Sequence, residues 1–156
     1  MFATANSDGP KVSEEWIAEA MYPYTAGLVI ATKGGYMRSG PDKWEINASA
    51  AHLEKALAGS LKRLRLQSID LYQLHRIDPK VAPEETFNFL RQAQSAGRIK
   101  HIGLSEVSVQ QIKKAREYFE VVSVQNMYSV DNRKWEEVLE YCITEGIAFI
   151  PWYPLS

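Results

Sequence analysis

Short apolar runs alternate with amphipathic, helix-like segments along almost the whole chain, and this alternation restricts its possible folds more than any other feature. Residues 28–32 and 69–74 have the length and composition of buried strands. The segment between them, residues 48–66, carries a stripe of leucines at helical spacing. Strands that alternate with helices are typical of repeated βα units, in which each helix connects two parallel strands. The pattern therefore predicts an α/β protein with a parallel sheet.

The alternation predicts six strands and five helices. The helix starts are indicated by Ser13 as a cap, by Pro83 followed by two acids, and by a capping box from Ser108 to Gln111. The strands are expected at residues 2–5, 28–32, 69–74, 99–104, 121–125 and 147–152, and the helices at 13–21, 49–64, 83–97, 108–118 and 132–144. The glycine-rich segment 34–45 is predicted to be a loop that lies over a site, because it is longer than a connector needs.

Two ionisable residues, Lys33 and His75, each follow one of these apolar runs. The carboxyl ends of parallel strands lie at the same face of a sheet, which is where such folds place their chemistry. Lys33 and His75 are therefore candidate active-site residues.

An open, doubly wound sheet and a closed barrel both fit the alternating pattern. No Gly-x-Gly-x-x-Gly follows the first strands, which disfavours the dinucleotide-binding version of the open sheet. We therefore expect a barrel. A complete eightfold barrel typically takes ~250 residues, so a chain of 156 residues is expected to form a single, incomplete barrel domain over residues 1–156.

Composition restricts the partners. A net charge of −1 gives no electrostatic reason to bind nucleic acid or an anionic membrane. No apolar run is long enough to span a membrane and no signal sequence is recognisable, so a cytoplasmic location is expected by default. The histidines have no metal-ligand spacing, and we expect no metal site. The single cysteine, Cys142, is expected to be a buried helix thiol.

Several motifs, in the right order along the chain, resemble the aldo-keto reductase family. They are residues 28–35 (LVIATKGG), 60–64 (SLKRL) with 69–75 (IDLYQLH), 103–106 (GLSE), 124–129 (VQNMYS) and 151–155 (PWYPL). The resemblance implies a partial (β/α)8 TIM barrel that contains strands 2 to 7 of the family. It also implies a lineage of oxidoreductases that pass a hydride from NADPH to an aldehyde or ketone, with a tetrad of Asp, Tyr, Lys and His.

By this resemblance, Lys33 is the tetrad lysine and His75 the tetrad histidine. A lysine cation beside the tetrad tyrosine lowers the pKa of the phenol, which makes it a better proton donor at neutral pH. The resemblance further implies that three residues hold the nicotinamide amide and that a tryptophan stacks on the ring. These cofactor residues are Ser105, Glu106, Gln125 and Trp152, and Glu106 stands where many members have Asn.

The chain departs from the family pattern near its beginning. On the alignment of residues 3–9, Ala3 occupies the position of the tetrad Asp and Asp8 that of the tetrad Tyr. An aspartate is shorter than tyrosine and normally ionised at pH 7, so it cannot donate a proton from the same place. The first and eighth strands and the segment that binds the 2′-phosphate of NADPH have no counterpart. We therefore expect weak or absent reductase activity; in an active enzyme another residue, for example Tyr22 or Tyr24, would have to supply the proton.

The alternative is a noncatalytic barrel fragment that acts through protein contacts. An unclosed barrel exposes two edge strands, here near Phe2 and Ile150, and exposed edges favour pairing with another chain. Self-association is then expected. A third possibility is that the chain is part of a longer protein.

Overall fold

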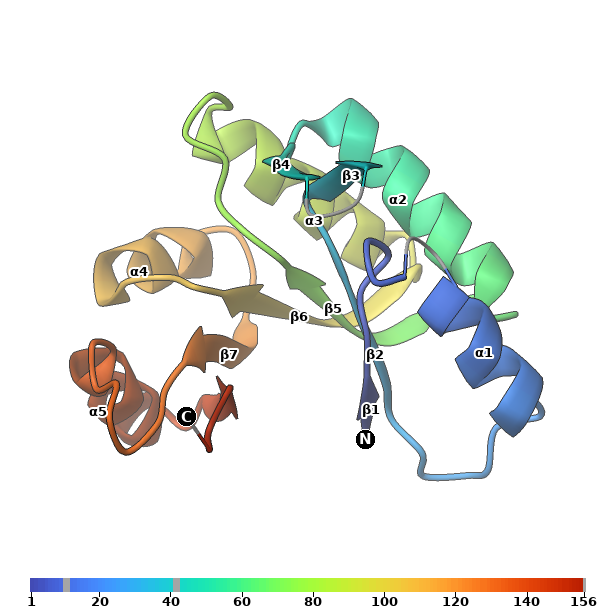
Figure 1. The fold of residues 1–156 in the computed structure, drawn as a ribbon. Helices are drawn as coiled ribbons and strands as arrows, with labels where there is room; N and C mark the ends of the chain where they lie inside the picture. The colour runs from blue at the N-terminus through green and yellow to red at the C-terminus, as the bar shows by residue number, and fades with distance from the viewer. Residues whose placement is uncertain (10–11, 41–42, 156) are drawn as a thin grey trace.

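The computed structural model describes residues 1–9, 12–40 and 43–155, and its main feature is a six-stranded parallel sheet (Figure 1). The strands lie in the order β1 (Phe2–Ala3), β2 (Ile30–Gly34), β5 (Ile69–Leu74), β6 (Ile99–Ser105), β7 (Val121–Met127) and β8 (Ala148–Trp152). The predicted parallel α/β architecture is confirmed. The strand bounds differ from the predicted ones by a few residues, and β2 extends to include Lys33.

The sheet is part of a barrel because its spatial order follows the chain order without a reversal. Right-handed crossovers that always advance in one direction place every helix on the same face. Figure 1 shows the helices on the outer side of a curved sheet. They are α1 (Val12–Met21), α2 (Ala50–Arg63), α3 (Pro83–Ser95), α4 (Val109–Arg116) and α5 (Glu136–Glu145). This arrangement confirms the predicted partial barrel.

The hydrophobic core lies between the sheet and the helices. Leu53 and Leu57, on the predicted leucine stripe of α2, are fully buried with Tyr72 of β5 and Phe87 of α3. Cys142 is also buried, as predicted, and burial raises the pKa of its thiol to about 11. A thiol with so high a pKa remains protonated and unreactive at pH 7.

Local capping signals fix several helix ends. At α4, the Ser108 Oγ accepts from the Gln111 N–H at 3.3 Å, and the Gln111 Oε1 accepts from the Ser108 N–H at 2.9 Å. The predicted capping box is therefore confirmed. Gly146 ends α5 with φ of 69°, a left-handed conformation that glycine adopts without steric cost. Ser13 lies inside α1 rather than before it.

The segment predicted to be a loop contains an antiparallel hairpin instead. Its strands are β3 (Tyr36–Gly40) and β4 (Lys43–Ile46), while residues 41–42 lie outside the described part. The Tyr36 and Trp44 rings pack edge to face with centroids 5.8 Å apart, and the Arg38 guanidinium lies 5.1 Å from the Trp44 ring centroid. The glycines suggested a loop, but these cross-strand contacts stabilise strands.

Candidate functional site

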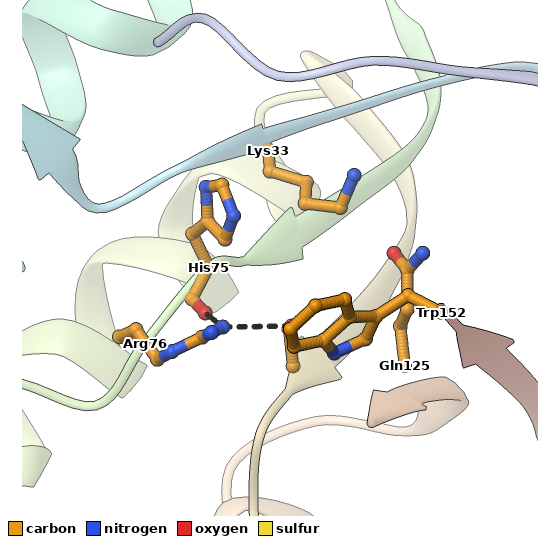
Figure 2. Close-up of a pocket in the computed structure, with 6 residues that line it drawn as sticks. Lys33, His75, Arg76, Gln125 and Trp152 are labelled. Carbon is orange, nitrogen blue, oxygen red and sulfur yellow. Dashed lines mark hydrogen bonds between the residues drawn. The ribbon is translucent and has the colours of Figure 1, made fainter. Parts of the chain in front are cut away.

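Lys33 and His75 meet at the carboxyl ends of two neighbouring strands, as the sequence predicts. Lys33 of β2 is in register with Gln73 of β5, and the His75 N–H donates to the Gly34 carbonyl at 2.8 Å. Both side chains line a cavity of about 220 Å³ (Figure 2). The other residues that line this cavity are Arg76, Ser105, Gln125 and Trp152.

The Lys33 side chain is nearly buried, with 9% of its surface exposed. Its Nζ donates to the Thr4 carbonyl oxygen at 3.0 Å. Burial lowers the pKa of Lys33, because an ammonium group loses hydration in the protein interior. The Asp8 carboxylate opposes this change of the pKa, and the Arg76 cation adds to it. Lys33 therefore loses its proton more readily than a lysine in water does.

His75 is held in its neutral form. Burial and the nearby cations of Lys33 and Arg76 lower its pKa to about 3. The ring packs edge to face on Tyr36 of β3, with ring centroids 4.6 Å apart. The buried Nδ1 has no hydrogen-bond partner among the described residues. At neutral pH this imidazole is uncharged, so it can form a hydrogen bond with a molecule in the cavity that it lines.

Arg76 is a cavity residue that the sequence analysis missed. Its Nη1 donates to the Ser105 Oγ at 3.1 Å and to the His75 carbonyl oxygen at 2.7 Å. The guanidinium carbon also lies 5.4 Å from the centroid of the Tyr36 ring. Its place directly after His75, just beyond a strand end, is the sequence signal that could have identified it. Through these contacts, Arg76 links the end of β5 and the end of β6 with the Tyr36 ring of the hairpin.

Three of the four predicted cofactor residues face the same cavity. Ser105 and Trp152 end strands β6 and β8, and Gln125 belongs to β7 (Figure 2). The Gln125 Oε1 atom is buried and has no hydrogen-bond partner among the described residues. A buried amide oxygen without a partner is a natural acceptor for a bound ligand.

The fourth predicted cofactor residue, Glu106, makes different contacts. Its carboxylate accepts from the Trp152 Nε1 at 2.8 Å, from the Trp135 Nε1 at 3.2 Å and from the Met127 N–H. The backbone of Glu106 has φ of 55°, in the left-handed region. Because these three donors engage both carboxylate oxygens, Glu106 fixes the orientation of the Trp152 ring at the cavity. A direct contact of Glu106 with a cofactor amide stays a prediction.

Ala3 and Asp8, which the family resemblance aligns with the tetrad Asp and Tyr, line a second hollow of about 440 Å³ between β1 and α1. Burial raises the pKa of the Asp8 carboxyl, and the Lys33 cation opposes this increase. Asp8 therefore borders the Lys33 side of the site. Tyr24 lies elsewhere: its hydroxyl donates to the Leu64 carbonyl at 2.8 Å, at the end of α2.

Two classes of site receive no support from the described residues 1–9, 12–40 and 43–155. In these ranges, no group of three or more His, Cys, Asp or Glu side chains could hold a metal ion. No helix in the same ranges has both the length and the apolar character that a bilayer crossing requires.

Comparison with known proteins identifies the family of the chain. A sequence model of the aldo/keto reductase family matches residues 1–156. The chain belongs to this family. It is 53% identical, over 98% of its length, to an uncharacterized oxidoreductase of Schizosaccharomyces pombe, of which it covers 50%. It is 34% identical to pyridoxine 4-dehydrogenase of Escherichia coli, with 98% of this chain and 56% of that protein covered.

The fold similarity extends to solved aldo-keto reductase structures. The structure of a glycerol dehydrogenase from Gluconobacter oxydans superposes with a TM-score of 0.89 at 28% sequence identity. The match covers 96% of this chain and 47% of that one. The chain thus spans about half the length of the relatives it matches, and it has the corresponding part of their barrel.

Proposed function

We propose that this aldo-keto reductase chain carries the nicotinamide end of a cofactor site and has little or no carbonyl reductase activity by itself. One observation supports this most strongly: residues in or directly after five strands, far apart in the sequence, line one cavity. They are Lys33, His75, Ser105, Gln125 and Trp152. The cavity of about 220 Å³ is smaller than the ~300–1,000 Å³ of typical small-molecule pockets. It suits one ring with its substituents rather than a whole dinucleotide.

The residues present fit a nicotinamide group. The unpartnered Gln125 Oε1 can accept from the carboxamide N–H, and the Ser105 hydroxyl can donate to the carboxamide oxygen. The Trp152 ring, held by Glu106, offers a flat surface for stacking. When bound, NADPH would supply the hydride. The neutral His75 would orient the carbonyl oxygen of a small aldehyde or ketone.

Proton donation is the step that this chain lacks. The tetrad positions for Asp and Tyr hold Ala3 and Asp8, and no phenol replaces the tyrosine at Asp8. Burial raises the pKa of the Asp8 carboxyl, which favours its protonated form. The Asp8 side chain is nevertheless shorter than a tyrosine by most of a ring, so it cannot place a proton where the phenol would. The expected consequence is that a bound carbonyl is oriented but reduced slowly or not at all.

We predict weak, saturable NADPH binding, because the nicotinamide contacts alone would anchor the cofactor. Titration followed by calorimetry and nicotinamide fluorescence is expected to give a Kd in about the millimolar range. Gln125→Ala should weaken binding, since it removes the unpartnered acceptor. Gln110→Ala, the same change at an exposed position of α4, is the matched control and should bind like the wild type. Absence of any binding at millimolar NADPH would contradict the proposed cofactor site.

The same preparation should show little turnover with a panel of small aldehydes and ketones. The measurement is NADPH oxidation at 340 nm, with Lys33→Met as the background. If the wild-type chain reduces carbonyls at a rate usual for enzymes and Lys33→Met abolishes it, the proposed inactivity is wrong. Another group would then supply the proton.

A second candidate function, self-association, is favoured by the edges of the sheet. In the described part of the chain, β1 and β8 each pair with one strand, and Phe2 is 47% exposed beside the hollow at α1. Unpaired backbone groups at such edges favour pairing with a second copy. Size-exclusion chromatography with light scattering should therefore report an oligomer, and Phe2→Lys should shift it toward the monomer. Val130→Lys, at an exposed loop position, is the control, and a wild-type monomer would refute this candidate.

A further inference from the structure

We propose that Lys33 is a covalent site for small aldehydes, at which its side-chain amine and an aldehyde in the cavity condense to an imine. The Lys33 side chain lines the cavity together with His75 and Arg76 (Figure 2). Its Nζ donates to the Thr4 carbonyl oxygen at 3.0 Å, a contact that uses an N–H and not the lone pair of the unprotonated amine. None of the ion pairs found among residues 1–9, 12–40 and 43–155 includes Lys33. This inference goes beyond the proposed function, because the reaction needs no nicotinamide.

The surroundings of Lys33 increase the share of the nucleophilic, unprotonated amine relative to a lysine in water. Only the unprotonated amine attacks a carbonyl carbon, and a desolvated lysine beside another cation gives up its proton more readily. Burial is the largest influence and lowers the pKa of Lys33. The negative charge of Asp8 raises this pKa, and the positive charge of Arg76 lowers it by a smaller amount. No carboxylate within ion-pair distance, among the residues described, holds the proton on this amine.

The reaction balances with groups already in the cavity. The Lys33 nitrogen attacks the aldehyde carbon, a C–N bond forms, and the carbonyl oxygen takes up a proton to give a carbinolamine. Loss of water then forms the C=N bond, so the two amine hydrogens and the aldehyde oxygen leave together. No oxidant or reductant is consumed. Water can carry the proton from nitrogen to oxygen, and the neutral His75 ring, which lies beside the Lys33 side chain in Figure 2, can hydrogen-bond to the carbonyl oxygen.

The size of the cavity sets the ligand class. A volume of about 220 Å³ lies below the ~300–1,000 Å³ of typical ligand pockets. Small aldehydes are therefore expected to react, and aldehydes on large ring systems are not. Exposed lysines can react with both small and large aldehydes, whereas Lys33 should react only with small ones.

The test is competitive reductive labelling of the full chain without nicotinamide. The probe is propanal at limiting concentration and neutral pH, with sodium cyanoborohydride to reduce the imine to a stable secondary amine. Peptide mass spectrometry then compares Lys33 with the exposed Lys55 and Lys80. We expect Lys33 to be labelled severalfold faster than Lys55 and Lys80. This preference should disappear in urea, which unfolds the cavity, and with pyrenecarboxaldehyde, whose ring system is too large for it. Labelling of Lys33 no faster than that of Lys55 and Lys80 would overturn the proposal.

Two charge variants test the physical cause. Asp8→Asn removes a negative charge that raises the pKa of Lys33 without forming an ion pair with it, so labelling of Lys33 should increase. Arg76→Gln removes the neighbouring cation, so labelling should decrease, and Arg76→Lys should restore it. Unchanged labelling of Lys33 in both Asp8→Asn and Arg76→Gln would overturn the proposal. Because NADPH is absent throughout, a failure of cofactor binding leaves these results unaffected.

Discussion

Replacing Glu14 with alanine is expected to lower the free energy of unfolding by about 3–5 kcal/mol. The Glu14 side chain on α1 is completely buried, and its carboxylate accepts from the Arg63 Nε of α2 at 2.7 Å and from the Thr32 Oγ1 of β2 at 2.6 Å. The Arg63 side chain is itself only 13% exposed. The alanine variant would therefore leave a largely buried guanidinium without its counter-ion, and this uncompensated charge is the main cost.

Urea or thermal denaturation of Glu14→Ala measures this loss. Glu15→Ala is the matched control, because Glu15 lies in the same helical turn but is exposed. It should change stability by less than about 0.5 kcal/mol. Glu14→Gln keeps an acceptor oxygen and should lose less than the alanine variant. Equal stability of the Glu14→Ala and Glu15→Ala variants would show that the α1 to α2 ion pair does not stabilise the fold.

Replacing Gly103 with alanine is expected to cost about 1–3 kcal/mol. A Cβ at Gly103 in β6 would lie 2.3 Å from the Ser123 Oγ, 2.9 Å from the Gln73 Cγ and 3.1 Å from the Ser123 carbonyl oxygen. Gln73 and Ser123 belong to the strands on either side, and the Gln73 Nε2 donates to the Ser123 Oγ at 3.3 Å. The methyl group would therefore separate strands that must pair to form the site.

A double variant identifies the cause of this loss. In Gly103→Ala/Ser123→Ala the shortest contact is absent, so part of the lost stability should return. The control is Gly40→Ala on the hairpin, where a Cβ would meet the Lys43 side chain at an ordinary distance of 3.8 Å. Denaturation midpoints of the three variants provide the measurement. If Gly103→Ala is as stable as Gly40→Ala, the inner face of the sheet is less tightly packed than the structure indicates.

The parts of the fold that the sequence predicted correctly depend on local patterns. The leucine stripe of α2, the capping box at Ser108 and the helix end at Gly146 involve residues within a few positions of one another. Such patterns act through the backbone of a single element and can be recognised without a tertiary structure. The hairpin at residues 36–46 was missed because its glycines suggested a loop, whereas cross-strand contacts such as Tyr36 with Trp44 stabilise it.

At the site, the pairing of Lys33 with His75 was predictable because both positions follow from the parallel arrangement of neighbouring strands. The contacts of Arg76 and Glu106 were not predictable in this way. Arg76 hydrogen-bonds to the Ser105 hydroxyl of β6. Glu106 accepts hydrogen bonds from the indole of Trp135, the residue directly before α5, and from that of Trp152 in β8. Side-chain contacts between segments that are distant in the chain are decided by the packing of those segments.

The sequence by itself determined the alternating βα architecture and the family, because both depend on the order of residue types along the chain. Only the tertiary structure decided the surroundings of Lys33: a buried amine that shares a cavity wall with Arg76 and hydrogen-bonds to a backbone carbonyl. The physical reason is that desolvation and charge interactions depend on distances in space, and three separate strands and their loops must pack before those distances exist.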